Sequence, residues 1–168
     1  MQILTSLLVW TLSVFQLSPA ARIVRSDPLL VRAVINGNTV DVATVGHVRL
    51  LGIDAPSLGN RSTSGEPYAR ESRDRLTGIV LNRWIRLEHE AGAGRAAYLM
   101  TEDGVFVNAL MVREGLARVA ARASLARFDE LKSAEREAQL SRRGMWSGSA
   151  QIPSPSYTRP STTKKKKQ

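Results

Sequence analysis

The stretch VINGNTVDVATVGHVRLLGIDAPS, residues 34–57, sets the first part of the fold. Asn and Gly at residues 36–38 form a turn between two apolar runs, because both residue types tolerate a positive φ angle. The runs at residues 29–35, 39–44 and 47–53 are rich in β-branched and other apolar side chains, which is typical of β-strands. Three short strands joined by tight turns predict an antiparallel meander.

Downstream of this meander, the sequence alternates between apolar strands and helical stripes. A polar loop, residues 58–65, precedes a helix that we predict over residues 66–81, where apolar residues recur on one face. The further predicted elements are a strand at residues 84–88, a hairpin of residues 96–100 and 105–107, and helices at residues 108–113 and 125–143. This order predicts an α+β domain whose five strands can close as a small β-barrel, with about three helices.

The composition limits the domain count and the chemistry. The chain has 168 residues and no cysteine, which indicates one domain with tails and excludes disulfides and thiolate metal sites. We assign that domain to residues 29–146. It carries 17 Lys and Arg against 14 Asp and Glu, so only +3 of the total charge of +9 belongs to it. The strongly basic balance therefore says little about the folded part.

The N-terminal end has the composition of an export signal. Residues 3–17 are an apolar run followed by small residues at 18–20, although no Lys or Arg precedes the run. We therefore predict a signal peptide over residues 1–21 and a secreted, periplasmic or cell-surface protein. The run is shorter than the roughly 20 residues of a membrane span, so we expect no stable span after cleavage. An uncleaved anchor is the alternative.

The C-terminal end is predicted to be a disordered basic tail. Residues 147–168 are rich in Ser, Thr and Pro and contain four consecutive lysines, Lys164, Lys165, Lys166 and Lys167. Such a cluster can contact nucleic acid, anionic lipid or a cell-wall polymer. A solvated tail without a partner is the alternative.

Two arginines and one aspartate at predicted strand ends are candidates for a phosphate site. Arg49 lies inside an apolar run that ends at Asp54, and an arginine in such a run needs an anion to bind. Arg95 follows the glycines of AGAGR, which let the backbone approach closely. Arginine binds phosphate oxygens with a planar fork, and a carboxylate can hold a divalent cation. A structural Arg–Asp pair is the alternative interpretation.

Ordered motifs from about residue 31 to residue 146 resemble the staphylococcal nuclease (thermonuclease) family. RAVINGNTV is similar to the family's D-G-D-T turn, VRLLGIDAP to R-L-x-x-I-D-x-P, and PYARES to the Y-G-x-E-A helix start. GRAAYLMTEDGVFVNALMVREGLARV and AEREAQLSRRGMW resemble the later motifs in the same order. The resemblance implies an OB-fold barrel of five strands capped by helices. It also implies a calcium-dependent phosphodiester hydrolase that acts on DNA or RNA.

The resemblance further implies roles for single residues. Arg49 and Arg95 occupy the positions of the two arginines that bind the phosphate and serve catalysis, and Asp54 occupies one calcium-binding position. Asn38 stands at the other, so the site lacks one negative charge and calcium should bind more weakly. Ser57 stands at the position of the glutamate that acts on the attacking water. Loss of a positioned base typically costs ~10²–10⁴-fold in rate.

Two carboxylates near the start of the predicted helix, Glu66 and Glu71, are candidate substitutes for that glutamate. The alternative is that they only interact favourably with the helix dipole. A nucleophilic Ser57 would need a neighbouring base. His47 is the nearest histidine in sequence, but strand geometry does not obviously bring these two residues together.

Seven further positions have an expected role or location. Ala93, Ala121 and Ala123 stand where the family frames the nucleotide with tyrosines. His89 and its two glutamate neighbours are expected on the surface, because adjacent strand residues point to opposite faces and chelate poorly. Trp146 is expected to fill the core.

We therefore expect an exported, monomeric, thermonuclease-like domain that acts on nucleic acid with weak or impaired catalysis, since Asn38 and Ser57 replace acidic residues. One alternative is a catalytically silent module that binds nucleic acid or another polyanion. A second alternative is a structural or partner-binding domain. Arg49 and Arg95 favour the first two interpretations over the third.

Overall fold

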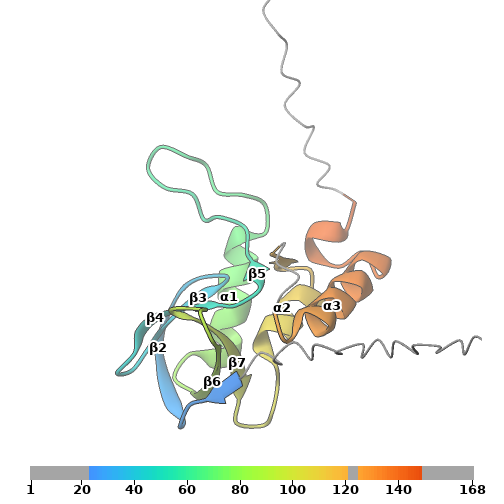
Figure 1. Cartoon of the computed structure of the whole chain (residues 1–168). Helices are drawn as coiled ribbons and strands as arrows, with labels where there is room; N and C mark the ends of the chain where they lie inside the picture. Colours follow the sequence, from blue (N-terminus) through green and yellow to red (C-terminus); the bar gives the residue numbers. More distant parts are fainter. Residues whose placement is uncertain (1–22, 121–124, 149–168) are drawn as a thin grey trace, which may run out of the picture.

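Five strands form a closed barrel with mixed strand directions (Figure 1). The structure is a computed structural model and describes residues 23–120 and 125–148. The barrel strands are β2 (Leu29–Asn36), β3 (Thr39–Val42), β4 (Gly46–Leu50), β6 (Trp84–Glu90) and β7 (Ala96–Thr101). They pair in the order β6-β2-β3-β4-β7, and β7 pairs again with β6, so the sheet closes on itself. The β4–β7 pair is parallel and the others are antiparallel. The predicted α+β barrel is confirmed.

Helices cover the barrel and share one core with it. They are α1 (Ala69–Val80), α2 (Val107–Arg113), α3 (Phe128–Leu140) and the 3-10 turn η1 (Gly144–Trp146). α1 packs against β2, and α2 packs against α3 and β7; Figure 1 shows α2 and α3 next to each other. Leu76 of α1, Met111 of α2 and Leu131 of α3 are fully buried in one cluster with Val40 of β3. Most residues of the helical stripes predicted from the sequence are therefore buried, whereas Leu140, at the end of the stripe predicted for α3, is exposed.

The turn between β2 and β3 packs directly on α1. A Cβ at Gly37 would lie 1.9 Å from the Oγ of Ser72, so only glycine fits without rearrangement. Ser72 is fully buried and donates a hydrogen bond to the carbonyl oxygen of Leu116 (2.8 Å). The backbone N–H of Asn38 donates to the Oδ1 of Asn36 (3.0 Å), which stabilises the turn. These contacts hold the backbone of Asn38 in place.

The strand predicted at residues 47–53 is in fact two strands. β4 ends at Leu50, and Gly52 adopts a φ of +80°, a conformation that glycine reaches without steric cost. β5 (Ile53–Asp54) then leaves the barrel and pairs with β8 (Arg118–Val119). β8 was not predicted, because a strand of two residues has no readable period. The bend is what carries Asp54 away from the barrel wall.

Four other elements differ from the prediction. α3 is shorter at both ends than the helix predicted at residues 125–143. α1 begins three residues later than expected, because Tyr68 has a left-handed φ of 66°. The predicted hairpin is reduced to β7 and an isolated antiparallel bridge between Met100 and Phe106, because α2 already begins at Val107. An unpredicted strand, β1 (Ile23–Arg25), pairs with β6 outside the closed ring.

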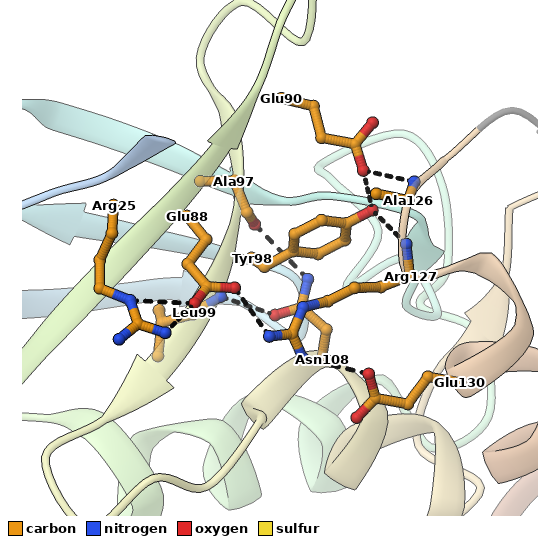
Figure 2. Close-up of polar contacts among 10 residues, drawn as sticks. All are labelled: Arg25, Glu88, Glu90, Ala97, Tyr98, Leu99, Asn108, Ala126, Arg127 and Glu130. Atoms are coloured by element: carbon orange, nitrogen blue, oxygen red, sulfur yellow. Dashed lines mark hydrogen bonds and ion pairs between the residues drawn. The ribbon is translucent and has the colours of Figure 1, made fainter. Parts of the chain in front are cut away.

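Glu88 is buried, so its expected surface position was wrong. Only 2% of the residue is exposed, and Figure 2 shows its carboxylate between two arginines. Arg25 of β1 lies 2.5 Å from Oε1, and Arg127, just before α3, lies 2.9 Å from Oε2. The guanidinium of Arg127 also lies 4.5 Å from the centre of the Phe106 ring. These contacts attach β1 and the start of α3 to the barrel.

Trp146 does not fill the core, so this expectation was wrong as well. It is half-buried in η1, and the guanidinium carbon of Arg118 lies 5.4 Å from the centre of its ring.

Several predictions concern residues outside the described part of the chain. They are the signal peptide, the basic tail and the positions Ala121 and Ala123. Within residues 23–120 and 125–148, no helix has both the length and the apolar character needed to cross a membrane.

Candidate active site

β4, the Gly52 turn and β5 place Arg49 and Asp54 side by side. The Nη2 of Arg49 donates a hydrogen bond to the Oδ1 of Asp54, which is the Arg–Asp pair considered from the sequence. The two side chains are 59% and 56% exposed. An exposed ion pair typically contributes only about 0–1 kcal/mol, so a phosphate or a cation can compete for either group.

A cleft of about 200 Å³ opens beside Asp54. β5 and the residues after it, the start of α1, β8 and η1 form its walls. Its lining residues are Asp54, Ala55, Pro56, Glu66, Pro67, Tyr68, Arg118 and Met145. A second cleft, of about 330 Å³, is lined by Asp54 as well and contains Arg49. Asp54 is thus common to both clefts.

The loop after β5 brings Glu66 back to Ser57. The backbone N–H of Ser57 donates to the Oε2 of Glu66 (2.6 Å), and the N–H of Glu66 donates to the carbonyl oxygen of Ser57 (2.8 Å). These two bonds close the loop at its base. The carboxylate of Glu66 therefore contacts the backbone of Ser57, the position where the resemblance leads us to expect a glutamate. Glu66 lines the same cleft as Asp54.

Asn38 is buried, with 6% of the residue exposed, and both the nitrogen and the oxygen of its side-chain amide are hydrogen-bonded. Its Nδ2 donates to the carbonyl oxygen of Ile53 (3.3 Å), and its Oδ1 accepts a hydrogen bond from the hydroxyl of Thr39 (3.3 Å). The side chain therefore supports the backbone of β5 immediately before Asp54. It stabilises the bend that presents Asp54 to the clefts.

The backbone of Arg95, the residue before β7, lies next to β4. Its carbonyl oxygen accepts a hydrogen bond from the N–H of Arg49 (3.2 Å). In the parallel pairing, however, Ala96 and not Arg95 stands opposite Arg49. The Arg95 side chain is exposed, and it lines neither of the two clefts described at Asp54.

The other proposed partners are in different places. His47 stands opposite Asp41 on the β3–β4 pair, with its Nε2 4.0 Å from that carboxylate. The Oγ of Ser57 accepts a hydrogen bond from the N–H of Gly59 (3.2 Å), a local loop contact. Glu71 is exposed and lines a neighbouring cleft that does not include Asp54. The geometry thus favours Glu66 over the other candidates.

Two residues of the cleft were missed from the sequence, Tyr68 and Arg118. Tyr68 was placed on a helix, but it precedes α1, and its hydroxyl lies 2.9 Å from the Oγ of Ser147. Arg118 stands opposite Asp54 in the β5–β8 pair. No local pattern indicates either position, because both depend on segments that are far apart in the chain.

The donor set of the cleft suits a hard divalent cation. Asp54 and Glu66 supply carboxylate oxygens, which are the ligands that calcium prefers. Within the described residues, however, no group of three or more His, Cys, Asp or Glu side chains could hold a metal ion. Calcium affinity rises with the number of charged ligands. The cleft therefore offers two carboxylates, fewer charged ligands than a tight calcium site uses.

Comparison with known proteins identifies similar chains. Residues 47–148 match the family described as "Staphylococcal nuclease homologue". A thermonuclease of Staphylococcus intermedius is 30% identical over 132 residues, which are 73% of this chain and 78% of that protein.

Two further relatives are longer proteins. The SPbeta prophage-derived endonuclease YokF of Bacillus subtilis is 31% identical over 131 residues, which are 72% of this chain and 44% of YokF. A probable endonuclease LCL3 of Leptosphaeria maculans is 30% identical over 110 residues, 60% of this chain. The chain covers only 37% of the length of that protein.

Proposed function

Because the chain belongs to the family of staphylococcal nuclease homologues, we propose that it hydrolyses phosphodiester bonds in nucleic acid, with calcium as a weakly bound cofactor. The observation that carries this proposal is the cleft that Asp54 shares with Glu66, beside the Arg49–Asp54 pair. Asp54 is the carboxylate proposed to bind the cation, and Arg49 is the guanidinium proposed to bind the phosphate. Glu66 supplies a second carboxylate beside Ser57, where the glutamate is missing.

In the proposed reaction, each residue has a distinct task. Arg49 binds the scissile phosphate, because its guanidinium offers parallel N–H donors to two phosphate oxygens. Arg95 is proposed to add positive charge from the adjacent strand. Glu66 accepts a proton from the attacking water, the water oxygen bonds to phosphorus, and the bond from phosphorus to the leaving oxygen breaks. The leaving oxygen takes up a proton from solvent.

Asp54 would hold the calcium ion, which when bound would stabilise the negative charge that develops on the phosphate. Asn38 contributes no charge to this site, and its amide nitrogen is committed to the carbonyl of Ile53. We therefore propose that catalysis is weak at low calcium concentrations.

A catalytically silent nucleic-acid-binding module is the second candidate. It is favoured by the buried, hydrogen-bonded amide of Asn38 and by the absence of a carboxylate at Ser57 itself. In that case Arg49 would still bind phosphate, but no water would be activated.

The test is cleavage of single-stranded DNA and RNA by the purified chain, in calcium and in EDTA. We expect calcium-dependent cleavage that Arg49→Ala abolishes. Glu66→Gln should lower the rate by ~10²–10⁴-fold, because the variant keeps the side-chain volume and loses the base. Glu71→Gln is the matched control, since it removes a charge from the same helix start without touching the Asp54 cleft.

The outcomes separate the candidates. Cleavage that persists in Arg49→Ala would indicate a contaminating enzyme. No cleavage by the unmodified chain, with DNA binding that Arg49→Ala weakens, would support the silent module. Equal losses in Glu66→Gln and Glu71→Gln would remove Glu66 from the role of base.

We also propose that the protein acts outside the cytoplasm, on the basis of the apolar run and small residues at its N-terminal end. N-terminal sequencing of the exported protein should show cleavage after Ala20; an intact N-terminus would support the membrane anchor instead.

A further inference from the structure

We propose that Arg118 is a second phosphate-binding site, which holds a phosphate next to the scissile one on the same nucleic-acid strand. This inference rests on the proposed function, because it requires a polynucleotide rather than a mononucleotide in the cleft. The consequence is a preference for longer substrates.

The position of Arg118 is set by the β5–β8 pair. It stands directly opposite Asp54, so both side chains leave the same face of this ribbon, with Cβ atoms about 5 Å apart. Arg118 lines the cleft that contains Asp54 and Glu66. Arg49 pairs with the same Asp54 and lines the second cleft. Asp54 therefore lies between two arginines, one in each cleft.

The charge of Arg118 is free for a ligand. Several arginines of the described residues are neutralised by ion pairs with carboxylates, as Arg49 is by Asp54 and Arg75 is by Glu114. Arg118 has no carboxylate within ion-pair distance among those residues, although Asp54 stands opposite it. Instead its guanidinium carbon lies 5.4 Å from the centre of the Trp146 ring. Such a contact restrains a guanidinium without neutralising it.

A restrained, unneutralised guanidinium in a cleft is suited to a phosphate. Its N–H donors match phosphate oxygens in two-point contacts, and the contact with Trp146 reduces the conformational entropy that the exposed side chain loses on binding. Because neighbouring phosphates of a strand are linked by one sugar, a strand bound at Arg49 would bring the next phosphate towards Arg118. The contact would be independent of base identity, since phosphates carry no sequence information.

Binding of single-stranded DNA to the full chain, measured in EDTA at several salt concentrations, tests the inference without cleavage. Arg118→Gln should weaken binding at low salt roughly three- to tenfold and lower the salt slope by about 0.7, the value for one phosphate contact on a single strand. Arg118→Lys should keep the slope, because it keeps the charge.

Arg83→Gln is the matched control. Arg83 is exposed and precedes β6, whose first residues pair with the last residues of β7. Arg49 is beside the first residue of β7. The two ends of this strand are roughly 16 Å apart at about 3.3 Å per residue, so Arg83→Gln should leave binding at the cleft unchanged.

Cleavage kinetics distinguish phosphate binding from a structural role. Arg118→Gln should raise the KM for an oligonucleotide several-fold, with kcat unchanged, and leave a dinucleotide with one phosphate unaffected. Equal losses on both substrates, or an unchanged salt slope, would overturn the inference. If the unmodified chain does not cleave, the proposed function fails, and the salt slopes of Arg118→Gln and Arg118→Lys still decide this inference.

Discussion

At residue 38, the side-chain amide donates a hydrogen bond, which an ionised carboxylate cannot do. The Nδ2 of Asn38 donates to the carbonyl oxygen of Ile53, so the side chain stabilises the bend before Asp54. An aspartate would place an oxygen against that carbonyl, unless a cation lay between them. The residue that weakens the proposed calcium site therefore also makes β5 independent of calcium.

Asn38→Asp should make the stability of the protein depend on calcium. In EDTA we expect a loss of about 1–3 kcal/mol in the free energy of unfolding, because a buried hydrogen bond is replaced by a repulsive contact. Calcium at 100 times its Kd should return about 2.7 kcal/mol. Thermal unfolding in EDTA and in calcium measures both effects.

Asn36→Asp is the control, because it adds the same charge to the same turn and keeps the oxygen that accepts from the N–H of Asn38. It should change stability little in EDTA. If both variants respond equally to calcium, the effect is only one of net charge, and position 38 is not a ligand position.

At the scale of elements, one tyrosine joins two barrel strands to the chain that enters α3. Tyr98 of β7 is fully buried and donates a hydrogen bond to Glu90 of β6. Its hydroxyl oxygen accepts from the N–H of Arg127 (3.3 Å), and Glu90 accepts from the N–H of Ala126 (2.7 Å) (Figure 2). Burial, reinforced by the bond to Glu90, raises the pKa of Tyr98 well above its usual 10.0.

This pKa shift predicts a stability difference that disappears at high pH. Below pH 10 the hydroxyl is protonated in both states, and Tyr98→Phe should cost about 1–2 kcal/mol of unfolding free energy. Above pH 10 the unfolded chain loses the proton while the folded chain retains it, so the native protein loses stability as pH rises. Tyr98→Phe has no hydroxyl proton at this position, so its stability lacks this dependence on pH.

Urea unfolding of the native protein and Tyr98→Phe at pH 8 and at pH 11 measures this difference. The stability advantage of the native protein should shrink between the two pH values. An advantage that stays constant would show that the hydroxyl titrates alike in both states and that burial does not protect it.

At the scale of the whole molecule, most of the net positive charge lies outside residues 29–146 of the sequence. The domain at residues 29–146 has a net charge of only +3, whereas Lys164 to Lys167 alone contribute +4. A basic segment tethered to a nuclease domain can raise the local concentration of a polyanionic substrate without contacting the site.

Replacement of the four lysines by glutamine should weaken DNA binding and leave the folded domain intact. We expect the salt slope of single-stranded DNA binding to fall by up to about 0.7 per lysine, since each releases one counterion at most. The midpoint of thermal unfolding should not change. An unchanged slope would support the solvated tail, which binds nothing.

The barrel and its helices could be read from local patterns. Period-2 runs, the Asn-Gly turn and helical stripes all report which face of an element is buried, and burial of those faces is what closes the sheet. The errors arose where an element is too short to show a period, as in β8, or where one glycine redirects a strand, as at Gly52.

For the site, the sequence by itself determined the residue types: Arg49, Asp54 and Glu66 are identifiable as candidates, and Asn38 and Ser57 as departures. Only the tertiary structure decided which of them meet. Whether Glu66 returns to Ser57, and whether Arg118 stands opposite Asp54, depends on where loops close and which strands pair. The first contact closes a short loop and the second joins segments that are far apart in the chain, and the geometry of both follows from packing of the whole domain rather than from any local period.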